Sequence, residues 1–175
     1  MEEKLNVIDS TTELLQYFNG STVITQADST YTATGIGTGL SVGDIVVISG
    51  AGQSGSNGTF VLTAVASGAI TVAGTIGTNE TATVTINQEY TGEWKEVRNF
   101  AVVVTTITST GNASLKIDQS GNGYTVDITT TTAITGGTAA TASLAVALPF
   151  ARLRVTNNGA DQTTLRAYMC GRTGT

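Results

Sequence analysis

Apolar and polar positions alternate along most of the chain, which is the period of a half-buried β-strand. Residues 59–65 place Phe60, Leu62 and Ala64 on one side and threonine and valine on the other. Asn57-Gly58 predicts a tight hairpin because both residues accept positive φ. Short strands at even spacing predict a small barrel or sandwich. The other strands expected in this part of the chain are at 31–34, 42–50, 69–72 and 80–86.

The second half of the chain carries a further series of alternating segments. Residues 99–109 place phenylalanine and valine on one side, and residues 115–120 alternate apolar and polar side chains. With 21 glycines, one proline and threonine at about a fifth of the chain, the composition favours strands and turns over helices. We therefore expect an all-β protein. Its remaining strands are predicted at 142–146, 150–156 and 164–170.

Charged side chains make up only 12% of the chain, and the net charge is −5. Charge is also depleted at the core of protein interfaces, although a threonine- and glycine-rich β protein of secreted type would show the same composition. No run of lysine or arginine is present, so we expect no nucleic-acid partner. No apolar run approaches the length of a membrane span, so we expect no membrane partner.

The sequence contains no histidine, which removes the commonest general base and leaves no pair that could activate a serine or cysteine nucleophile. Glu89, Glu93 and Glu96 surround Trp94. A sugar stacked on the tryptophan between two carboxylates is one interpretation, and a solvated strand edge balanced by the interleaved lysine and arginine is the other. We expect no catalytic residue, no cofactor and no metal site, and therefore no enzyme.

A few other side chains could carry a specific interaction. Asp118 and Asp127 are expected on polar faces of adjacent strands, where they either bind calcium or are isolated surface aspartates. Arg152 and Arg154 share one face of a predicted strand. They could recognise carboxylates of a neighbouring subunit, or bridge a glutamate of the same domain. Cys170 is expected to be a small buried apolar residue, with a reactive or intermolecular thiol as the alternative.

Two patterns resemble parts of tailed-phage virion proteins. Thr91-Gly-x-Trp94, followed by Leu-x-Ile-x-x-Ser-x-x-Gly at 115–123 and Phe150-Ala-Arg-Leu-Arg-Val-Thr-Asn157, resembles their small jelly-roll domains. Over residues 22–86, Gly-Leu-Ser-Val-Gly-Asp-Ile-Val-x-Ile-Ser-Gly and the later Asn-Gly-Thr-Phe resemble a small β-barrel module of phage tail and head proteins. The jelly-roll family often carries Ser-x-Asp-Gly where this chain has Asn122, which weakens a cation-binding role for that turn.

The resemblance implies that a first strand stands just before Thr-Gly-x-Trp, yet the candidate, residues 6–15, lies roughly seventy residues too early. We therefore expect a jelly-roll β-sandwich with a small β-barrel inserted near its N-terminus. The expected parts are 1–20, an arm or first strand; 21–88, the inserted barrel; and 89–175, the jelly roll. Two consecutive domains with an N-terminal arm are the alternative. The candidate interface residues are Leu14, Leu15, Tyr17, Phe18, Arg152 and Arg154.

These patterns predict a non-enzymatic structural component of a tailed-phage virion, with a capsid decoration (cement) protein as the first hypothesis. A neck or tail accessory protein and a carbohydrate- or receptor-binding tip are the alternatives. The expected partners are the major capsid protein or the head–tail and tail proteins of the same particle, with homo-oligomerisation in the assembly. Residues 1–4 lack the apolar core of a signal peptide, so synthesis in the host cytoplasm and location on the particle surface are expected.

Overall fold

The computed structural model describes the backbone of residues 2–8 and the backbone and side chains of residues 14–173. Over these residues the regular secondary structure is almost all β-strand, with one short 3-10 helix, η1 (Ser54–Ser56), so the all-β prediction is confirmed. None of the described helical residues forms a helix long and apolar enough to cross a membrane. The chain folds into two compact units, Met1–Leu14 with Thr91–Thr175, and Leu15–Tyr90.

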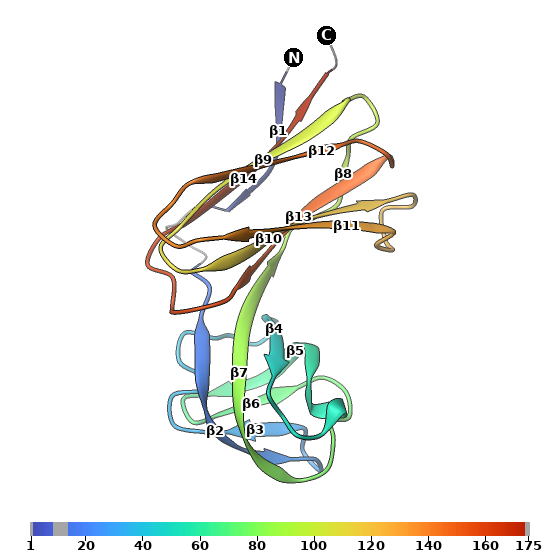
Figure 1. Cartoon of the computed structure of the whole chain (residues 1–175). Helices are drawn as coiled ribbons and strands as arrows, with labels where there is room; N and C mark the ends of the chain where they lie inside the picture. Colours follow the sequence, from blue (N-terminus) through green and yellow to red (C-terminus); the bar gives the residue numbers. More distant parts are fainter. Residues whose placement is uncertain (1, 9–13, 174–175) are drawn as a thin grey trace. The chain divides into compact units, whose positions relative to one another are not determined.

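The unit Leu15–Tyr90 is a closed six-stranded barrel. Neighbouring strands run antiparallel in the order β7-β2-β3-β6-β5-β4, and β4 also pairs with β7 (Figure 1). Closure removes the open edges that a flat sheet would present to other chains. The strands are β2 (Tyr17–Thr25), β3 (Thr30–Thr32), β4 (Ile45–Ser49), β5 (Gly58–Ala66), β6 (Ala69–Val72) and β7 (Glu80–Thr91).

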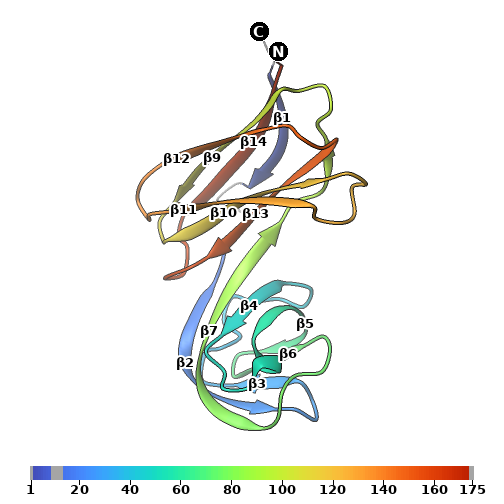
Figure 2. The same cartoon turned by 45° about the vertical axis from the view of Figure 1, so that its right-hand side comes forward.

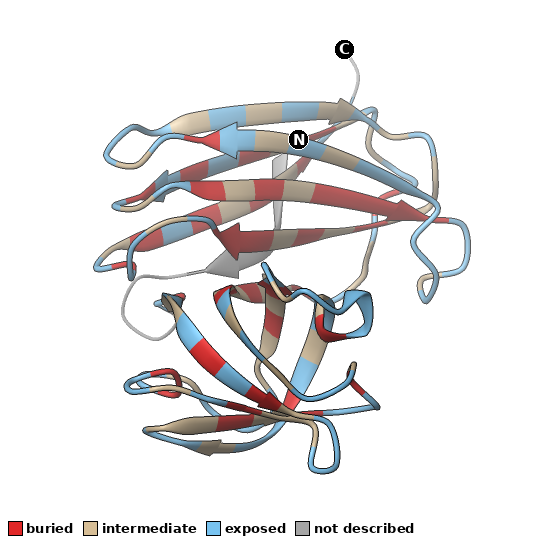
Figure 3. Ribbon diagram, turned by 60° about the horizontal axis from the view of Figure 1, so that its bottom comes forward, coloured by how far each residue is buried: buried red, intermediate tan, exposed pale blue. Residues whose placement is uncertain are grey.

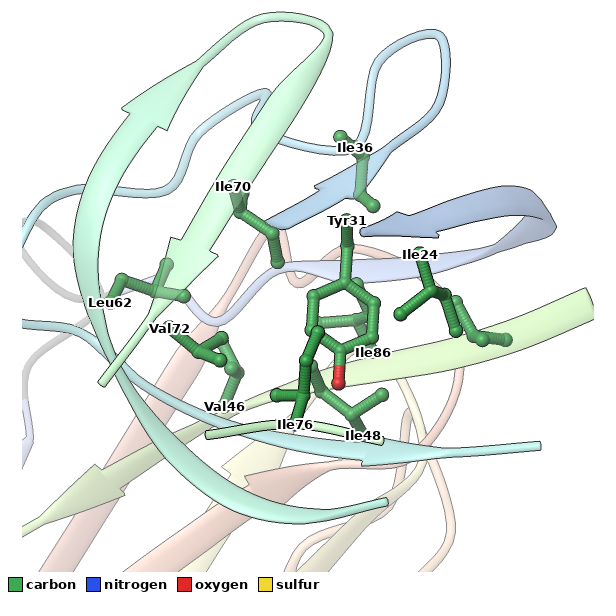
Figure 4. Packing of buried hydrophobic residues seen from close by; sticks show 11 residues of the cluster. Ile24, Tyr31, Ile36, Val46, Ile48, Leu62, Ile70, Val72, Ile76 and Ile86 are labelled. Carbon is green, nitrogen blue, oxygen red and sulfur yellow. The ribbon is translucent and has the colours of Figure 1, made fainter. Parts of the chain in front are cut away.

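Apolar side chains from all six strands fill the barrel interior (Figure 4). They come from alternate positions, as the period-two pattern predicts: in β4, Val46 and Ile48 are buried while Val47 between them is partly exposed. Each fully buried aliphatic side chain contributes about 1.5–3 kcal/mol. The buried cluster comprises Ile24, Tyr31, Ile36, Val46, Ile48, Leu62, Ile70, Val72, Ile76, Val84 and Ile86.

Tyr31 is the largest side chain of this core, and its ring lies among the aliphatic residues in Figure 4. Its hydroxyl donates a hydrogen bond to the carbonyl oxygen of Ser56 at 2.8 Å, which anchors η1 to the barrel interior. Burial raises the pKa of Tyr31 to about 12, because the phenolate would lose its hydration and the hydrogen bond to Ser56 only partly offsets that loss.

The connection between β4 and β5 differs from the tight hairpin expected at Asn57-Gly58. Gly58 has a positive φ of 140°, but Asn57 is extended with φ −111°. The Asn57 side chain instead closes a longer loop: its oxygen accepts from the amide of Ala51 at 2.9 Å, and its nitrogen donates to the carbonyls of Ala51 and Gln53. Asn57 therefore acts through its side chain and not through a left-handed backbone.

The other unit is a sandwich-like pair of antiparallel sheets, seen as two layers in Figures 1 and 2. The order is β1-β14-β9-β12 in one sheet and β11-β10-β13-β8 in the other. The strands are β1 (Glu2–Ile8), β8 (Lys95–Glu96), β9 (Val102–Ser109), β10 (Ala113–Ser120), β11 (Ile128–Ile134), β12 (Ala140–Ala145), β13 (Phe150–Asn157) and β14 (Leu165–Arg172).

Burial alternates along the strands of the sandwich, as the red and lighter bands of Figure 3 show. Leu153 of β13 and Met169 of β14 are fully buried, for example, while Arg152 and Tyr168 beside them are partly exposed. Cys170 lies on the same side of β14 as Tyr168 and is only partly buried, so the expectation of a buried cysteine is wrong. The physical reason is its position, which is out of phase with the buried residues of β14.

Gln119 is a buried polar exception at the end of β10. Its side-chain oxygen accepts from the amides of Ala147 and Leu148 at 2.8 and 3.0 Å, and its nitrogen donates to the carbonyl of Ala145 at 3.0 Å. These bonds satisfy the backbone of the connection from β12 to β13, which would otherwise bury unpaired polar groups. The side chain of Gln119 thus holds the backbone at the end of β12 and just after it.

The boundaries of the units differ from those drawn from sequence. The first expected boundary followed residue 20, but β2 begins at Tyr17 and pairs with β7 along its length, so residues 17–20 belong to the barrel. The second boundary lies after Tyr90 and not after Gln88, because β7 continues to Thr91. Of the candidate first strand at 6–15, residues 6–8 lie in β1 and residues 9–13 are outside the described residues.

We predict that Tyr31→Phe removes a phenol that ionises only near pH 12 in the folded chain. The raised pKa means that stability is fully present below pH 10 and is lost as the pH rises through about 12, at a cost of roughly 2–3 kcal/mol. A spectrophotometric titration near 295 nm should therefore lose its phenolate step near pH 12 in the variant. Tyr124→Phe, at an exposed position, is the control, and a late step that survives in Tyr31→Phe would contradict the assignment.

Candidate functional site

The outward face of the β11-β10-β13-β8 sheet carries polar side chains in cross-strand rows. Register places Asp118 of β10 between Thr129 of β11 and Arg152 of β13. Two residues along, Lys116 lies opposite Arg154. Because side chains on one face of a strand recur at every second residue, these residues share the face opposite the sandwich core. Antiparallel pairing thus brings together side chains that lie far apart in the sequence.

Asp118 is fully buried beneath the side chains that bind it. Its Oδ2 accepts from the Nε atoms of Arg152 and Arg154 at 3.0 and 2.6 Å. Its Oδ1 accepts from Nη2 of Arg154 and from the hydroxyl of Thr129, both at 2.8 Å. The side chains of Arg152 and Arg154 are 20% and 19% exposed, whereas that of Asp118 has no exposed area. We call Asp118, Thr129, Arg152 and Arg154 the Asp118 cluster.

Asp118 lies on the polar face of β10 as expected, but the expectation of an isolated surface aspartate is wrong. Burial raises the pKa of its carboxyl, but the hydrogen bonds from Arg154, Thr129 and Arg152 outweigh burial and hold the pKa below the ordinary 3.8. The two arginines share the face that the sequence predicted, and Asp118 is the carboxylate that they bind. The sequence alone left open whether the arginines bind a carboxylate of a neighbouring subunit or a glutamate of the same domain.

Trp94 extends the Asp118 cluster toward the edge of the sheet. The guanidinium carbon of Arg152 lies 4.5 Å from the centre of the tryptophan ring, in cation–π geometry. The backbone beside Trp94 is fixed to β13 as well, because the amide of Gly92 donates to the carbonyl of Leu153 at 2.8 Å. The segment 91–94 and β13 are thus joined by both backbone and side-chain contacts.

The three glutamates near Trp94 do not form a shared carboxylate site. Glu93 accepts a hydrogen bond from Lys95 at 2.8 Å, and this bond lowers the pKa of the Glu93 carboxyl. Glu96 pairs with Arg98, and Glu89 is buried and belongs to the barrel unit. Each of the two exposed glutamates therefore forms an ion pair with a basic residue two positions later in the sequence. This arrangement favours the interpretation as a solvated strand edge over that as a sugar site.

The loop between β10 and β11 presents an exposed aromatic ring. Asn122 accepts from the amides of Tyr124 and Thr125 at 2.9 Å, and Ser120 accepts from the amide of Gly123 at the same distance. Asp127 accepts from the amide of Gly121 at 2.7 Å. Asn122 thus organises the turn through its amide oxygen. The loop holds Tyr124 with 89% of its surface exposed.

The four apolar candidates near the N-terminus are not assembled into one exposed patch. Leu14 is 36% exposed, whereas Leu15 is buried. Tyr17 lies in β2 opposite Asn87, and Phe18 packs against the barrel core. Their role in an interface stays a prediction, and part of the proposed arm, residues 9–13, lies outside the described residues.

The sandwich also contains a groove and two aspartates that lie in separate environments. A shallow groove of about 280 Å³ is lined by Arg98, Phe100 and residues 146–149. Among the described residues, no group of three or more histidine, cysteine, aspartate or glutamate side chains is arranged to hold a metal ion. Asp127 is engaged by its own loop and Asp118 by the arginines, so the two aspartates do not form the calcium site considered from sequence.

No protein-family model matches the chain, and no curated protein is significantly similar to it in sequence. The geometry of the site is therefore the main ground on which a function can be argued. The Asp118 cluster and Trp94 together include two arginines and a tryptophan, residue types that are enriched in binding hot spots.

We predict that Asp118→Asn destabilises the sandwich by about 3 kcal/mol, because removing the anion of a buried ion pair leaves its cations uncompensated. Asp28→Asn, at an exposed position of the barrel, is the matched control and should change stability little. Denaturant unfolding followed by Trp94 fluorescence reports on the sandwich. Equal unfolding midpoints for wild type and Asp118→Asn would show that the Asp118 cluster contributes no stability.

Wild type and Asp118→Asn should also differ in how their stability depends on pH. Since the pKa of Asp118 is lowered in the folded state, its contribution is fully present above the ordinary pKa of 3.8 and is lost as the pH falls through the folded value. The stability difference between wild type and Asp118→Asn should therefore be constant near neutral pH and shrink below about pH 3.8. A difference that grows on acidification would contradict the lowered pKa.

Proposed function

We propose that this chain is a non-enzymatic structural component of a tailed-phage particle, and specifically a capsid decoration protein. The observation that carries the proposal is the contact between the two segments on which the resemblance to phage jelly rolls rests. Trp94 stacks on Arg152, and Gly92 bonds to Leu153, so Thr91-Gly-x-Trp94 and Phe150–Asn157 are structural neighbours. Motifs that meet in space support a common origin better than motifs that are only present in one sequence.

The strand order of the sandwich supports a jelly roll. Counted along the chain, its eight described strands pair first with eighth (β1–β14), second with seventh (β8–β13), third with sixth (β9–β12) and fourth with fifth (β10–β11). This nested series is what results when one long antiparallel hairpin rolls into two sheets. Double-sheet jelly rolls of this kind occur in viral capsid proteins and in lectins.

The position of the barrel supports an insertion into that roll. Residues 15–90 stand between β1 and β8, the first two strands of the nested series, and they form a compact unit of their own. Insertion into an exposed connection leaves the pairing of the host fold unchanged. The barrel adds a second surface to the same chain, which suits a protein that bridges neighbouring subunits of a shell.

Surface chemistry is consistent with assembly. Residues 15–90 contain four acidic residues and no lysine or arginine, so every cation of the chain lies in the other unit. Threonine-rich, weakly charged surfaces pack without ordering long charged side chains. Repeated on a symmetric shell, many small contacts of this kind gain strength through multivalency.

A receptor- or glycan-binding tip is the second candidate, and Tyr124 is the observation that favours it. An aromatic ring with 89% of its surface exposed, on a loop fixed by hydrogen bonds, is the kind of platform on which a sugar stacks. Binding on a glycan array that is lost in Tyr124→Ala would favour this function. Silence on the array together with binding to capsids would favour decoration. A neck or tail accessory protein is distinguished from a decoration protein by its lower copy number.

We predict that this chain is present at hundreds of copies in each purified particle, because a decoration protein occupies sites that repeat across the shell. Quantitative mass spectrometry should measure its ratio to the major capsid protein. About a dozen copies or fewer would place the chain at the neck or tail, and absence from particles would reject the virion proposal.

Particles that lack the chain should assemble but lose resistance to heat. The physical reason is that each decoration contact adds its binding free energy to shell subunits that already hold together. The release temperature of packaged DNA, followed with an intercalating dye, measures the loss and its recovery when purified protein is added back. Unchanged release temperature would count against a cementing role.

A further inference from the structure

Arg152 is held rigidly but uses only part of its hydrogen-bonding capacity. Its Nε donates to Oδ2 of Asp118, and its guanidinium lies against the ring of Trp94. Among the hydrogen bonds and ion pairs formed by the described residues, none uses its two terminal nitrogens. The side chain is 20% exposed. A fixed guanidinium therefore presents free N–H donors to solvent.

Asp118 cannot satisfy those donors, because its acceptor sites are filled. A carboxylate has about four lone-pair sites. Here two on Oδ2 accept from the Nε atoms of Arg152 and Arg154, and two on Oδ1 accept from Arg154 and Thr129. Arg154 binds the carboxylate through two nitrogens, whereas Arg152 binds it through one. The two arginines are therefore not equivalent, although the sequence pattern treats them alike.

We propose that the Nη fork of Arg152, backed by Trp94, is a recognition site for a carboxylate on the surface of a partner protein. The assignment of the partner to the particle rests on the proposed function. A guanidinium fork matches the two oxygens of a carboxylate in a bidentate pair. The stacking on Trp94 and the bond to Asp118 have already ordered the side chain, so binding costs little further conformational entropy.

The surroundings favour a carboxylate over a phosphate. Glu93, beside Trp94, and Glu96, in β8, are exposed on the same edge of the sheet. Each of them is paired with a cation, Lys95 or Arg98, so one guanidinium fork balances a singly charged carboxylate but would leave part of the charge of a phosphate uncompensated. Trp94 supplies apolar contact for the methylene groups of an aspartate or glutamate side chain, and tryptophan and arginine are both enriched in binding hot spots.

The test uses the whole chain, labelled with ¹⁵N, and sodium acetate as the probe. Acetate, compared with sodium chloride at equal ionic strength, should shift the Nε–H signal of Arg152 and the indole N–H signal of Trp94 in a saturable way. Inorganic phosphate forms the second arm. Tighter binding of phosphate than of acetate would overturn the assignment to a carboxylate, and the absence of any saturable shift would overturn the site itself.

Arg152→Lys keeps the charge but removes the fork, so the Trp94 shift should need about tenfold more acetate, as expected for the loss of one charge-assisted hydrogen bond. Arg166→Lys, on the other sheet, is the matched control and should titrate like wild type. Trp94→Leu, followed through the Arg152 signal, serves if Arg152→Lys fails to fold, and it should also weaken binding. Wild-type affinity in a folded Arg152 or Trp94 variant would refute the proposal, whereas absence of the chain from particles would refute only the proposed function.

Discussion

The barrel begins and ends on two neighbouring antiparallel strands, and the arrangement of the chain depends on that pairing. Tyr17 of β2 lies opposite Asn87 of β7. Just before it, the amide of Gln16 donates to the side chain of Gln88, and the amide of Gln88 donates to the carbonyl of Gln16. The chain therefore leaves the barrel beside the point where it enters. This allows β1 to pair with β14 although a whole folded unit separates β1 from β8.

The two units are stabilised by different balances of interactions. The barrel is a closed sheet around an aliphatic core. The hydroxyl of Tyr31 is a polar group within this core, and it donates a hydrogen bond to the carbonyl oxygen of Ser56. The sandwich adds a buried charge on its outward face, where the cost of desolvating Asp118 is offset only by an almost complete set of donors. A slip of one residue between β10 and β13 would move Asp118 to the core face. The Asp118 cluster therefore specifies register as well as contributing stability.

Two partly or fully exposed side chains of the sandwich are held in fixed positions. Asn122 fixes the loop that exposes Tyr124, and Asp118 and Trp94 together fix Arg152. In each case a buried or half-buried group orders a side chain that can contact a partner. Such pre-ordering reduces the entropy lost on binding. This property suits the structural role that we propose.

The sequence by itself determined the all-β fold and most strand positions, because alternation of apolar and polar residues is a local property that does not depend on which strands pair. It also placed Arg152 and Arg154 on one face, for the same reason. Only the tertiary structure decided that Asp118 is their buried partner, since the pairing of β10 with β13 is set by the whole fold. Asp118 occupies a position that alternation assigns to solvent. It is buried because the side chains of neighbouring strands cover it, and no local pattern records which neighbours those are.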